Sequence, residues 1–445
     1  MAATTQHKER SRIAGLPPRN IALGLVHAVL DNQRSLTSTL EADIAGQENA
    51  SAPDRAFGRL IATTTLRRLG EIDTIIDALL QRPLPRKALK VQHILRIAAA
   101  QSAFIGTASH AVVNCAVEQA KRTTGRYSPL VNAVSRRFLS VDEVEPPVDP
   151  SVNIPGWLWA TWVKTYGIDA ASRIGRAHQN EPPLDLTIAT PSDSARWAGI
   201  LGGEVLIPGT VRLPRAQNVP KLEGFEDGAW WVQDVAASLP ARILLASLDS
   251  PKKAHIVDLC AAPGGKTSQL LSTGATVTAL DIDPVRLARL SNNLSRLGLS
   301  AALVVADGRT WQPSDIRLFD AVLLDAPCTA TGNIRRHPDI PWLKRSTDVA
   351  QASTIQSELL AAAWRLVRPG GHLVYAVCSL QPDEGKRQAV AFVTDSDAER
   401  APITLAETQG FVEPDSDGDL QTLPFLHDKI GGMDGFFIAR FRKPA

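Results

Sequence analysis

The stretch DLCAAPGGKTSQL, residues 258–270, decides the fold of the larger part of this chain. It joins a short apolar run, HIVDL (255–259), to a segment with helical spacing, and Gly264 and Gly265 lie at the junction. Glycines let the backbone approach a ligand closely, and unpaired N–H groups at a helix start hold carboxylates or phosphates. The pattern predicts a strand, a ligand-binding turn and a helix; a tight structural turn is the alternative for the loop alone.

The same alternation of strand, turn and helix continues toward the C-terminus. The predicted strands are HIVDL (255–259), TVTALD (276–281), ALVVAD (302–307), DAVLLD (320–325) and HLVYAV (372–377), with helical segments at 266–272, 284–297 and 348–367. Short, almost wholly apolar strands are typical of a sheet buried on both faces. We therefore predict an α/β Rossmann-like domain with a mostly parallel, doubly wound sheet. The run FFIARFR (436–442) is expected to close the sheet as an antiparallel edge strand.

The N-terminal third has a different character. Apolar residues recur at helical spacing over residues 20–139, which predicts an all-α bundle. Residues 1–140 hold 19 Lys and Arg against 10 Asp and Glu, although the whole chain has a net charge of only +2. This asymmetry favours a polyanionic partner for the helical part, with a solvated basic surface as the alternative.

Composition gives the class of protein and the remaining boundaries. With 445 residues, 44% hydrophobic and 21% charged, the chain is globular and multidomain. The predicted organisation is a flexible basic arm (1–18), a helical domain (19–140), a Pro-rich acidic linker (141–155), a small α+β subdomain (156–240) and the α/β domain (241–445). In the subdomain, Trp157, Trp159 and Trp162 could stack nucleobases, but we favour packing anchors.

The cysteine pattern and the lack of a long apolar segment indicate the cellular compartment of the protein. The four cysteines have no CxxC spacing, so the sequence indicates neither a disulfide framework nor a zinc site. No segment has the features of a signal peptide or a membrane span. We expect a reducing, cytoplasmic location and no membrane partner.

Polar residues follow the predicted strands at the edge where a ligand would bind. Asp281 ends the second strand, about 20 residues after the glycine loop, where an acid typically accepts ribose hydroxyls. Asp307 follows the third strand and suits the exocyclic amine of an adenine, with a simple turn-forming Asp as the alternative. These residues predict a nucleoside-containing cofactor.

Two cysteines follow the next two strands. Cys328 lies in LLDAPCTATG after the fourth strand, and Cys378 lies in LVYAVCS after the fifth. Neighbouring parallel strands end at one crevice, so both thiols and Asp325 are expected to meet there. A single buried cysteine is usually a small hydrophobe, but a pair beside a carboxylate favours thiolate chemistry.

These residues resemble a known family, the Fmu/Sun RNA cytosine-5 methyltransferases, and within it the bacterial enzymes of small-subunit ribosomal RNA. The matching motifs are AAPGGKT (261–267), Asp281, Asp307, DAPC (325–328), Cys378–Ser379 with Glu384, and DGFF (434–437). The helical part is similar to a NusB-type RNA-binding domain through DRAFGRLIATTTLRRLGEID (54–73), ILRIAAAQ (94–101), VNCAVEQAK (113–121) and LVNAV (130–134).

The resemblance implies a function and a role for each site residue. It implies methylation of cytosine position 5 in 16S rRNA with S-adenosylmethionine as methyl donor. We expect a monomer without a DNA or metal partner. Cys378 would be the nucleophile at ring position 6, Cys328 would assist product release, Asp325 would bind the cytosine edge and Lys266 would contact the base. The implied cofactor pocket consists of Cys260, Ala261, Ala262, Pro263, Gly264, Gly265, Lys266, Asp281, Asp307 and Asp325.

Three departures from the family pattern are present. Val377 replaces a usual threonine, Ala330 replaces a usual glycine, and SPLVNAVSRR (128–137) lacks the usual Arg-Gly start. Arg335, Arg336 and His337 form a basic cluster that is expected to hold RNA phosphates, with an exposed basic loop as the alternative.

Other functions remain as alternatives. One is methylation of tRNA or another RNA; a DNA cytosine methyltransferase is disfavoured by the second crevice cysteine and the helical domain. Another is a non-catalytic RNA-binding regulator, which the intact cysteine pair argues against. A nucleotide-dependent oxidoreductase would explain the glycine loop and Asp281 but not the two cysteines.

Overall fold

The computed structural model describes residues 15–445, apart from 44–49, 139–148, 215–217 and 314–317. The chain divides into two compact units, each described here by itself. One unit comprises residues 1–156 together with His337–Leu343, and the other comprises Trp157–Arg336 together with Lys344–Ala445. Most of the predicted arm (1–14) and much of the predicted linker (141–148) lie outside the described residues.

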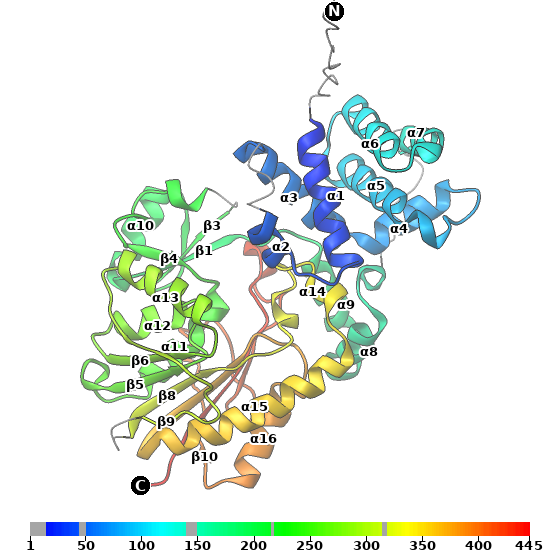
Figure 1. Ribbon diagram of the computed structural model, residues 1–445. Coiled ribbons are helices and arrows are strands. Elements are labelled where there is room, and N and C mark those ends of the chain that lie inside the picture. Colours follow the sequence, from blue (N-terminus) through cyan, green and yellow to red (C-terminus); the bar gives the residue numbers. More distant parts are fainter. Residues whose placement is uncertain (1–14, 44–49, 139–148, 215–217, 314–317) are drawn as a thin grey trace, which may run out of the picture. The chain divides into compact units, whose positions relative to one another are not determined.

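The first unit is helical, which confirms the predicted all-α bundle (Figure 1). Its helices are α1 (Leu16–Leu30), α2 (Leu36–Asp43), α3 (Ala52–Arg67), α4 (Leu69–Leu79), α5 (Leu89–Ala100), α6 (Ser109–Thr124), α7 (Ser128–Arg137) and α14 (Ile340–Leu343). Apolar residues three or four positions apart explain them: α4 buries Ile72, Ile75, Ile76 and Leu79 along one face.

The described residues next to both boundaries of the helical domain are more ordered than the sequence suggests. Pro17 and Pro18 were expected to end the flexible arm, but they lie in the first turn of α1, where proline suits the helix geometry. Residues 150–153 of the predicted linker form a 3₁₀ turn, and the Asn153 side chain accepts a hydrogen bond from the Glu71 N–H at 3.1 Å. The described end of the linker is therefore packed onto α4.

A segment from far along the chain completes the helical unit. The predicted α/β domain (241–445) includes residues 337–343, whereas the structure packs Trp342 against the apolar core of α1 and α3. The Trp342 indole donates to the Leu66 carbonyl at 3.0 Å, and the Leu36 N–H donates to Asp339 at 2.9 Å. Trp342 is thus part of the core of the helical unit, although it is far from the helices of that core in sequence and local periodicity cannot predict the contact.

The second unit begins with a small α+β part. It contains α8 (Gly156–Tyr166), α9 (Ile168–His178), α10 (Ser194–Leu201) and the strands β1 (Leu184–Ile188), β2 (Glu204–Ile207), β3 (Thr210–Leu213) and β4 (Trp230–Val232). The strands form an antiparallel sheet in the order β2-β3-β1-β4. Trp162 of α8 is fully buried, with its ring 5.4 Å from the ring of His178, as expected for a packing anchor.

The larger part of this unit is the α/β domain (Figure 1). Its strands are β5 (His255–Leu259), β6 (Thr276–Asp281), β7 (Ala302–Val305), β8 (Phe319–Asp325), β9 (Val367–Val377), β10 (Glu399–Arg400), β11 (Leu420–Gln421) and β12 (Phe437–Arg442). Its helices are α11 (Val235–Ala246), α12 (Gly265–Leu271), α13 (Pro284–Arg296), α15 (Ser346–Leu366) and α16 (Lys386–Asp395).

The sheet has the order β10-β12-β9-β8-β5-β6-β7, and the strands from β9 to β7 run parallel. The predicted mostly parallel, doubly wound sheet is confirmed. One correction concerns β12, which is antiparallel as expected but lies between β9 and the two-residue strand β10 instead of at the edge. The strand order reverses between β5 and β8, which is where ligands bind in such folds.

Both faces of the sheet are covered by helices. Alternate strand residues point to opposite faces: Leu323 packs on the side of α11 to α13, whereas Val322 and Leu324 pack on the side of α15 and α16. Figure 1 shows these helices on the two sides of the sheet. None of the described helices has both the length and the apolar character that crossing a bilayer requires.

Candidate active site

The two cysteines meet at the carboxyl ends of β8 and β9, which are parallel neighbours. Cys328 lies three residues after β8, and Cys378 follows β9 directly. Their Sγ atoms are 3.4 Å apart, and both residues are half-buried. The structure therefore brings the two thiols to the same edge of the sheet, in contact with each other.

Backbone hydrogen bonds fix the loop that carries Cys328. The Gly332 N–H donates to the Cys378 carbonyl at 3.0 Å, and the Gly435 N–H donates to the Gly332 carbonyl at 2.9 Å. A Cβ on Gly332 would lie 1.9 Å from the Gly435 carbonyl oxygen, so only glycine fits this crossing. The terminal DGFF segment thus holds the cysteine loop in place.

Asp325 and Lys266 form an ion pair beside the cysteines. The Lys266 Nζ lies 2.7 Å from Asp325 Oδ2 and 5.2 Å from the centre of the Phe436 ring. Burial alone would lower the pKa of Lys266, but the Asp325 carboxylate outweighs burial and raises that pKa. Lys266 is therefore a fixed positive charge beside the cysteines, while the Asp325 side chain remains 31% exposed and accessible to a ligand.

The glycine loop follows β5 as predicted. Gly264 has a φ of +102° and a Cβ there would lie 2.9 Å from the Leu290 side chain, so the turn requires glycine. The Thr267 hydroxyl donates to Asp258 at 2.6 Å and anchors α12 to the strand, while no side chain caps the first turn of α12. Burial raises the pKa of Cys260 to about 12, so this thiol is inert.

The acid that ends β6 and the acid that follows β7 occupy different surroundings. Asp281 is buried and accepts hydrogen bonds from the backbone N–H groups of Asp283 and Ala262, at 3.0 and 3.2 Å. Asp307 is partly exposed and pairs with Arg309 at 2.6 Å, and this hydrogen bond lowers the pKa of Asp307. A ligand amine at Asp307 would therefore share the carboxylate with Arg309.

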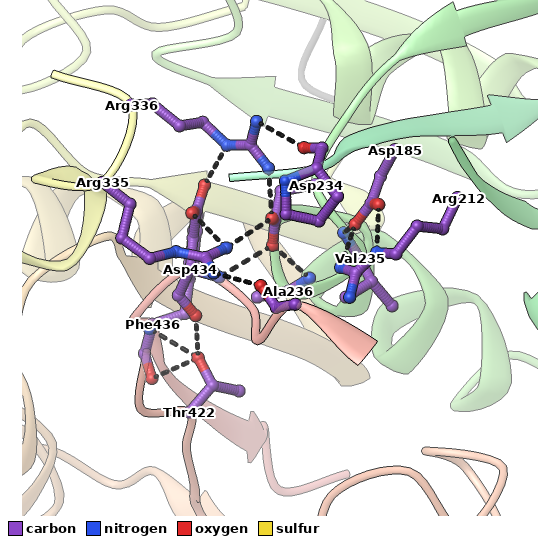
Figure 2. Close-up of polar contacts among 12 residues, drawn as sticks. Asp185, Arg212, Asp234, Val235, Ala236, Arg335, Arg336, Thr422, Asp434 and Phe436 are labelled. Atoms are coloured by element: carbon purple, nitrogen blue, oxygen red, sulfur yellow. Dashed lines mark hydrogen bonds and ion pairs between the residues drawn. The ribbon is translucent and has the colours of Figure 1, made fainter. Parts of the chain in front are cut away.

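The predicted RNA-binding cluster at Arg335 and Arg336 is wrong, because both side chains are occupied by carboxylates (Figure 2). Arg336 donates to Asp434 at 2.7 Å and to Asp234 at 2.5 Å, and Arg335 lies 3.3 Å from Asp434. The side chain of Arg335 is 3% exposed. Buried charges require such partners, so these arginines anchor the cysteine loop instead of facing solvent.

This network predicts a large loss of stability for Asp434→Ala. The substitution removes one of the two carboxylates that neutralise Arg335 and Arg336, so that two buried guanidinium groups share the single negative charge of Asp234. We expect a loss of about 3 kcal/mol, or roughly 5–10 °C in the unfolding midpoint. Thermal unfolding monitored by circular dichroism measures it, with the exposed Asp395→Ala as control. Equal midpoints for the two variants would contradict the role of the network.

The departure at Ala330 has a structural consequence. Ala330 has a φ of +58°, a left-handed conformation that costs a non-glycine residue about 1 kcal/mol. We expect Ala330→Gly to raise the unfolding midpoint slightly, because relief of strain exceeds the added entropy of the unfolded chain. Ala326→Gly is the control: it makes the same chemical change in the same loop at a residue whose φ is not positive. This variant should have a lower unfolding midpoint than the wild type. An unfolding midpoint of Ala330→Gly below that of the wild type would contradict the proposed backbone strain at Ala330.

Comparison with known proteins identifies the family. The family model described as 16S rRNA methyltransferase RsmB/F matches residues 245–442, and the NusB family model matches residues 16–140. The ribosomal RNA small subunit methyltransferase B of Sodalis glossinidius is 36% identical over 96% of this chain and 97% of its own length. The protein of the same name from Salmonella typhi is 35% identical over 96% of this chain and 98% of its own length.

This chain belongs to the RsmB/F family of 16S rRNA methyltransferases. Crystal structures of other proteins have a fold similar to that of this RsmB/F protein. PH0851 has a TM-score of 0.75, covers 97% of this chain and 99% of its own, and is 22% identical. NSun6 from Pyrococcus horikoshii with SFG has a TM-score of 0.54 and is 21% identical in sequence. The match covers 65% of this chain and 98% of the NSun6 chain.

The site of this RsmB/F protein fits S-adenosylmethionine, the methyl donor of the family. The uncapped first turn of α12 offers backbone N–H groups to a carboxylate. Asp281 at the end of β6 and Asp307 after β7 offer acceptors to hydroxyl and amine groups. Asp281 and the loop from Cys260 to Lys266 lie at neighbouring strand ends. The chemistry of these groups therefore matches the polar groups of the donor.

Proposed function

We propose that this RsmB/F protein methylates position 5 of a cytosine in 16S rRNA, with Cys378 as the nucleophile. The observation that carries the proposal is the pair of sulfur atoms 3.4 Å apart, next to the ion pair of Asp325 and Lys266. Packing does not require two thiols in contact at a crevice, whereas covalent activation of a pyrimidine uses a thiolate and a proton acceptor.

Covalent addition makes the ring reactive. Position 5 of cytosine is a weak nucleophile, so the Cys378 thiolate forms a bond to position 6 and the ring π electrons move toward position 5. Asp325 holds the cytosine edge and stabilises the positive charge that the ring carries when N3 takes a proton from water, and this proton leaves N3 again when the thiolate is eliminated. Lys266 contacts the same base. When bound, S-adenosylmethionine supplies the methyl group to position 5.

Release of the product requires a base. The proton on position 5 is removed, its electron pair re-forms the ring double bond, and the carbon–sulfur bond breaks so that Cys378 leaves as a thiolate. We assign proton removal to Cys328. The hydrogen bond to Cys378, followed by burial, raises the pKa of Cys328 in the free protein. Once Cys378 is a thioether it carries no negative charge and is only a weak acceptor, so Cys328 can then release its proton to water and act as the base.

The chemistry also restricts the RNA. A thiolate approaches a cytosine from the face of its ring, which is covered in a stacked duplex, so the target must be unpaired or flipped out. The helical unit is the basic part of the chain and is expected to supply affinity through phosphate contacts. We expect the protein to act as a monomer in the cytoplasm.

Methyl transfer from labelled cofactor to naked 16S rRNA and to assembled small subunits tests the proposal. Nuclease digestion followed by mass spectrometry identifies the modified nucleoside, and tRNA serves as the control substrate. The expected product is 5-methylcytidine in 16S rRNA alone. A methyl group on another atom, or equal methylation of tRNA, would overturn the proposed position or substrate.

A further inference from the structure

The two thiols beside Asp325 are close enough to react with each other. Cys328 and Cys378 are both free and half-buried, so each side chain is partly open to solvent. Their Sγ atoms lie 3.4 Å apart, and a disulfide bond of about 2.0 Å would form if they approached by about 1.4 Å. A reactive thiol in contact with a second thiol is the arrangement of redox-sensitive cysteines.

The backbone brings the two side chains within the span of a disulfide. Asp325 of β8 is paired with Ala376 of β9, and the Gly332 N–H donates to the Cys378 carbonyl at 3.0 Å. Neighbouring strands lie about 4.8 Å apart, and disulfides join Cα atoms that are about 4.4–6.8 Å apart. Rotation of the two cysteine side chains therefore suffices to close the bond, and the strands stay paired.

A buried carboxylate holds the two cysteine loops together. Thr329 directly follows Cys328, and Ser379 directly follows Cys378. Glu384 is fully buried, and its carboxylate accepts hydrogen bonds from the Thr329 N–H at 2.7 Å and from the Ser379 hydroxyl. The contact between the sulfur atoms is therefore supported by the backbone on both sides and does not depend on the cysteine side chains alone.

The proposed methyl transfer uses both thiols in the reduced form. Cys378 forms the bond to the ring, and Cys328 removes the proton from position 5. A disulfide between them would remove the nucleophile and the base together, because neither sulfur would carry a free electron pair as a thiolate. The contact that serves catalysis thus also exposes the site to a single oxidation event.

We propose that Cys328 and Cys378 form a reversible disulfide when the protein meets a peroxide, and that this bond stops methyl transfer until a dithiol reduces it. Formation of the disulfide depends only on the contact between the two thiols. The loss of activity rests on the proposed function, in which both cysteines take part in the reaction.

The oxidation is written here for Cys378 as the first thiol to react. Its thiolate bonds to one oxygen of hydrogen peroxide and the O–O bond breaks; the hydroxide that leaves takes up the proton that Cys378 released, which gives water and a sulfenic acid. The Cys328 sulfur then bonds to the Cys378 sulfur, the S–O bond breaks, and the Cys328 proton leaves with the hydroxyl group as a second water. The two sulfur atoms together give two electrons to the peroxide.

Peptide mapping after peroxide treatment tests the proposal. The full-length protein is reduced, freed of reductant, treated with hydrogen peroxide, alkylated with N-ethylmaleimide and digested without reductant. In the wild type, we expect most molecules to yield a peptide pair joined through Cys328 and Cys378, together with loss of methyl transfer to 16S rRNA. Dithiothreitol should separate the pair by thiol–disulfide exchange and restore the activity.

Cys328→Ala and Cys115→Ala are matched variants, because each removes one thiol. Without the thiol that contacts it, Cys378 should be oxidised to a sulfinic acid, which dithiothreitol does not reverse. Cys115 is buried in α6 of the helical unit. Cys115→Ala should therefore form the same joined pair as the wild type and recover to the same extent with dithiothreitol.

Several outcomes would overturn the proposal. One is a sulfinic acid on Cys378 of the wild type while Cys328 is still alkylated, and another is a disulfide to Cys115, to Cys260 or to a second molecule. A third is alkylation of both Cys328 and Cys378 at a peroxide concentration that oxidises free glutathione in the same time. If Cys328→Ala does not fold, the peptide map of the wild type decides.

The peptide map requires neither RNA nor S-adenosylmethionine, so its outcome is separate from that of the proposed function. A joined pair in a protein whose reduced form makes no 5-methylcytidine contradicts the proposed function alone. A reduced protein that makes 5-methylcytidine, but in which peroxide joins no Cys328–Cys378 pair, contradicts this inference alone.

Discussion

Cys378→Ala is expected to abolish methyl transfer to 16S rRNA. Alanine has no sulfur to bond to ring position 6, so position 5 stays unactivated while the fold and the cofactor loop remain intact. Loss of a nucleophile that acts together with its neighbours typically lowers turnover by at least about 10⁴-fold. Incorporation of labelled methyl groups under single-turnover conditions measures this loss.

Cys115→Ala is the control for this experiment. Cys115 is buried in α6 of the helical unit, and its substitution makes the same chemical change away from the crevice. We expect Cys115→Ala to retain turnover. Full activity of Cys378→Ala, together with an inactive Cys328→Ala that forms no adduct, would show that the roles of the two crevice cysteines are reversed.

Cys328→Ala is expected to trap the protein on its RNA. The Cys378 thiolate still adds to the ring and the methyl group still reaches position 5, but the group that removes the proton is missing. Loss of a positioned general base typically slows such a step by about 10²–10⁴-fold. A covalent complex should therefore accumulate and survive denaturing electrophoresis, where labelled RNA moves with the protein.

The double variant Cys328→Ala/Cys378→Ala distinguishes a true adduct from tight binding. It lacks the nucleophile as well, so no complex should survive denaturation. A complex of equal amount in the double variant would contradict the assignment of Cys378. Rapid turnover of Cys328→Ala without any adduct would contradict the role of Cys328 in release.

Much of the fold could be predicted because parallel strands buried on both faces are short apolar runs with polar residues at their ends. β5 and β6 have the predicted bounds, and β8 differs by one residue at its start. The place of β12 could not be predicted, because its neighbour β10 has two residues and no apolar pattern. Trp342 in the helical unit escaped prediction since its partners are more than 270 residues away.

The site was predictable where it follows strand ends and unpredictable where it depends on burial. Cys328 and Cys378 come together because β8 and β9 are neighbours. Arg335 and Arg336 look like an exposed basic run in the sequence, since their partners, Asp234 and Asp434, lie about 100 residues away in either direction. Glu384 belongs to a motif that the sequence shows, but its burial is visible only in the structure.

Trapping with 16S rRNA that carries 5-fluorocytosine tests the central claim most directly. A fluorine at position 5 cannot leave as a proton, so the wild-type protein and cofactor should stall as a covalent complex after methyl transfer. Proteolysis and mass spectrometry then identify the residue that bears the nucleotide. We expect the nucleotide on the sulfur of Cys378; a nucleotide on Cys328, or no covalent complex at all, would contradict the account.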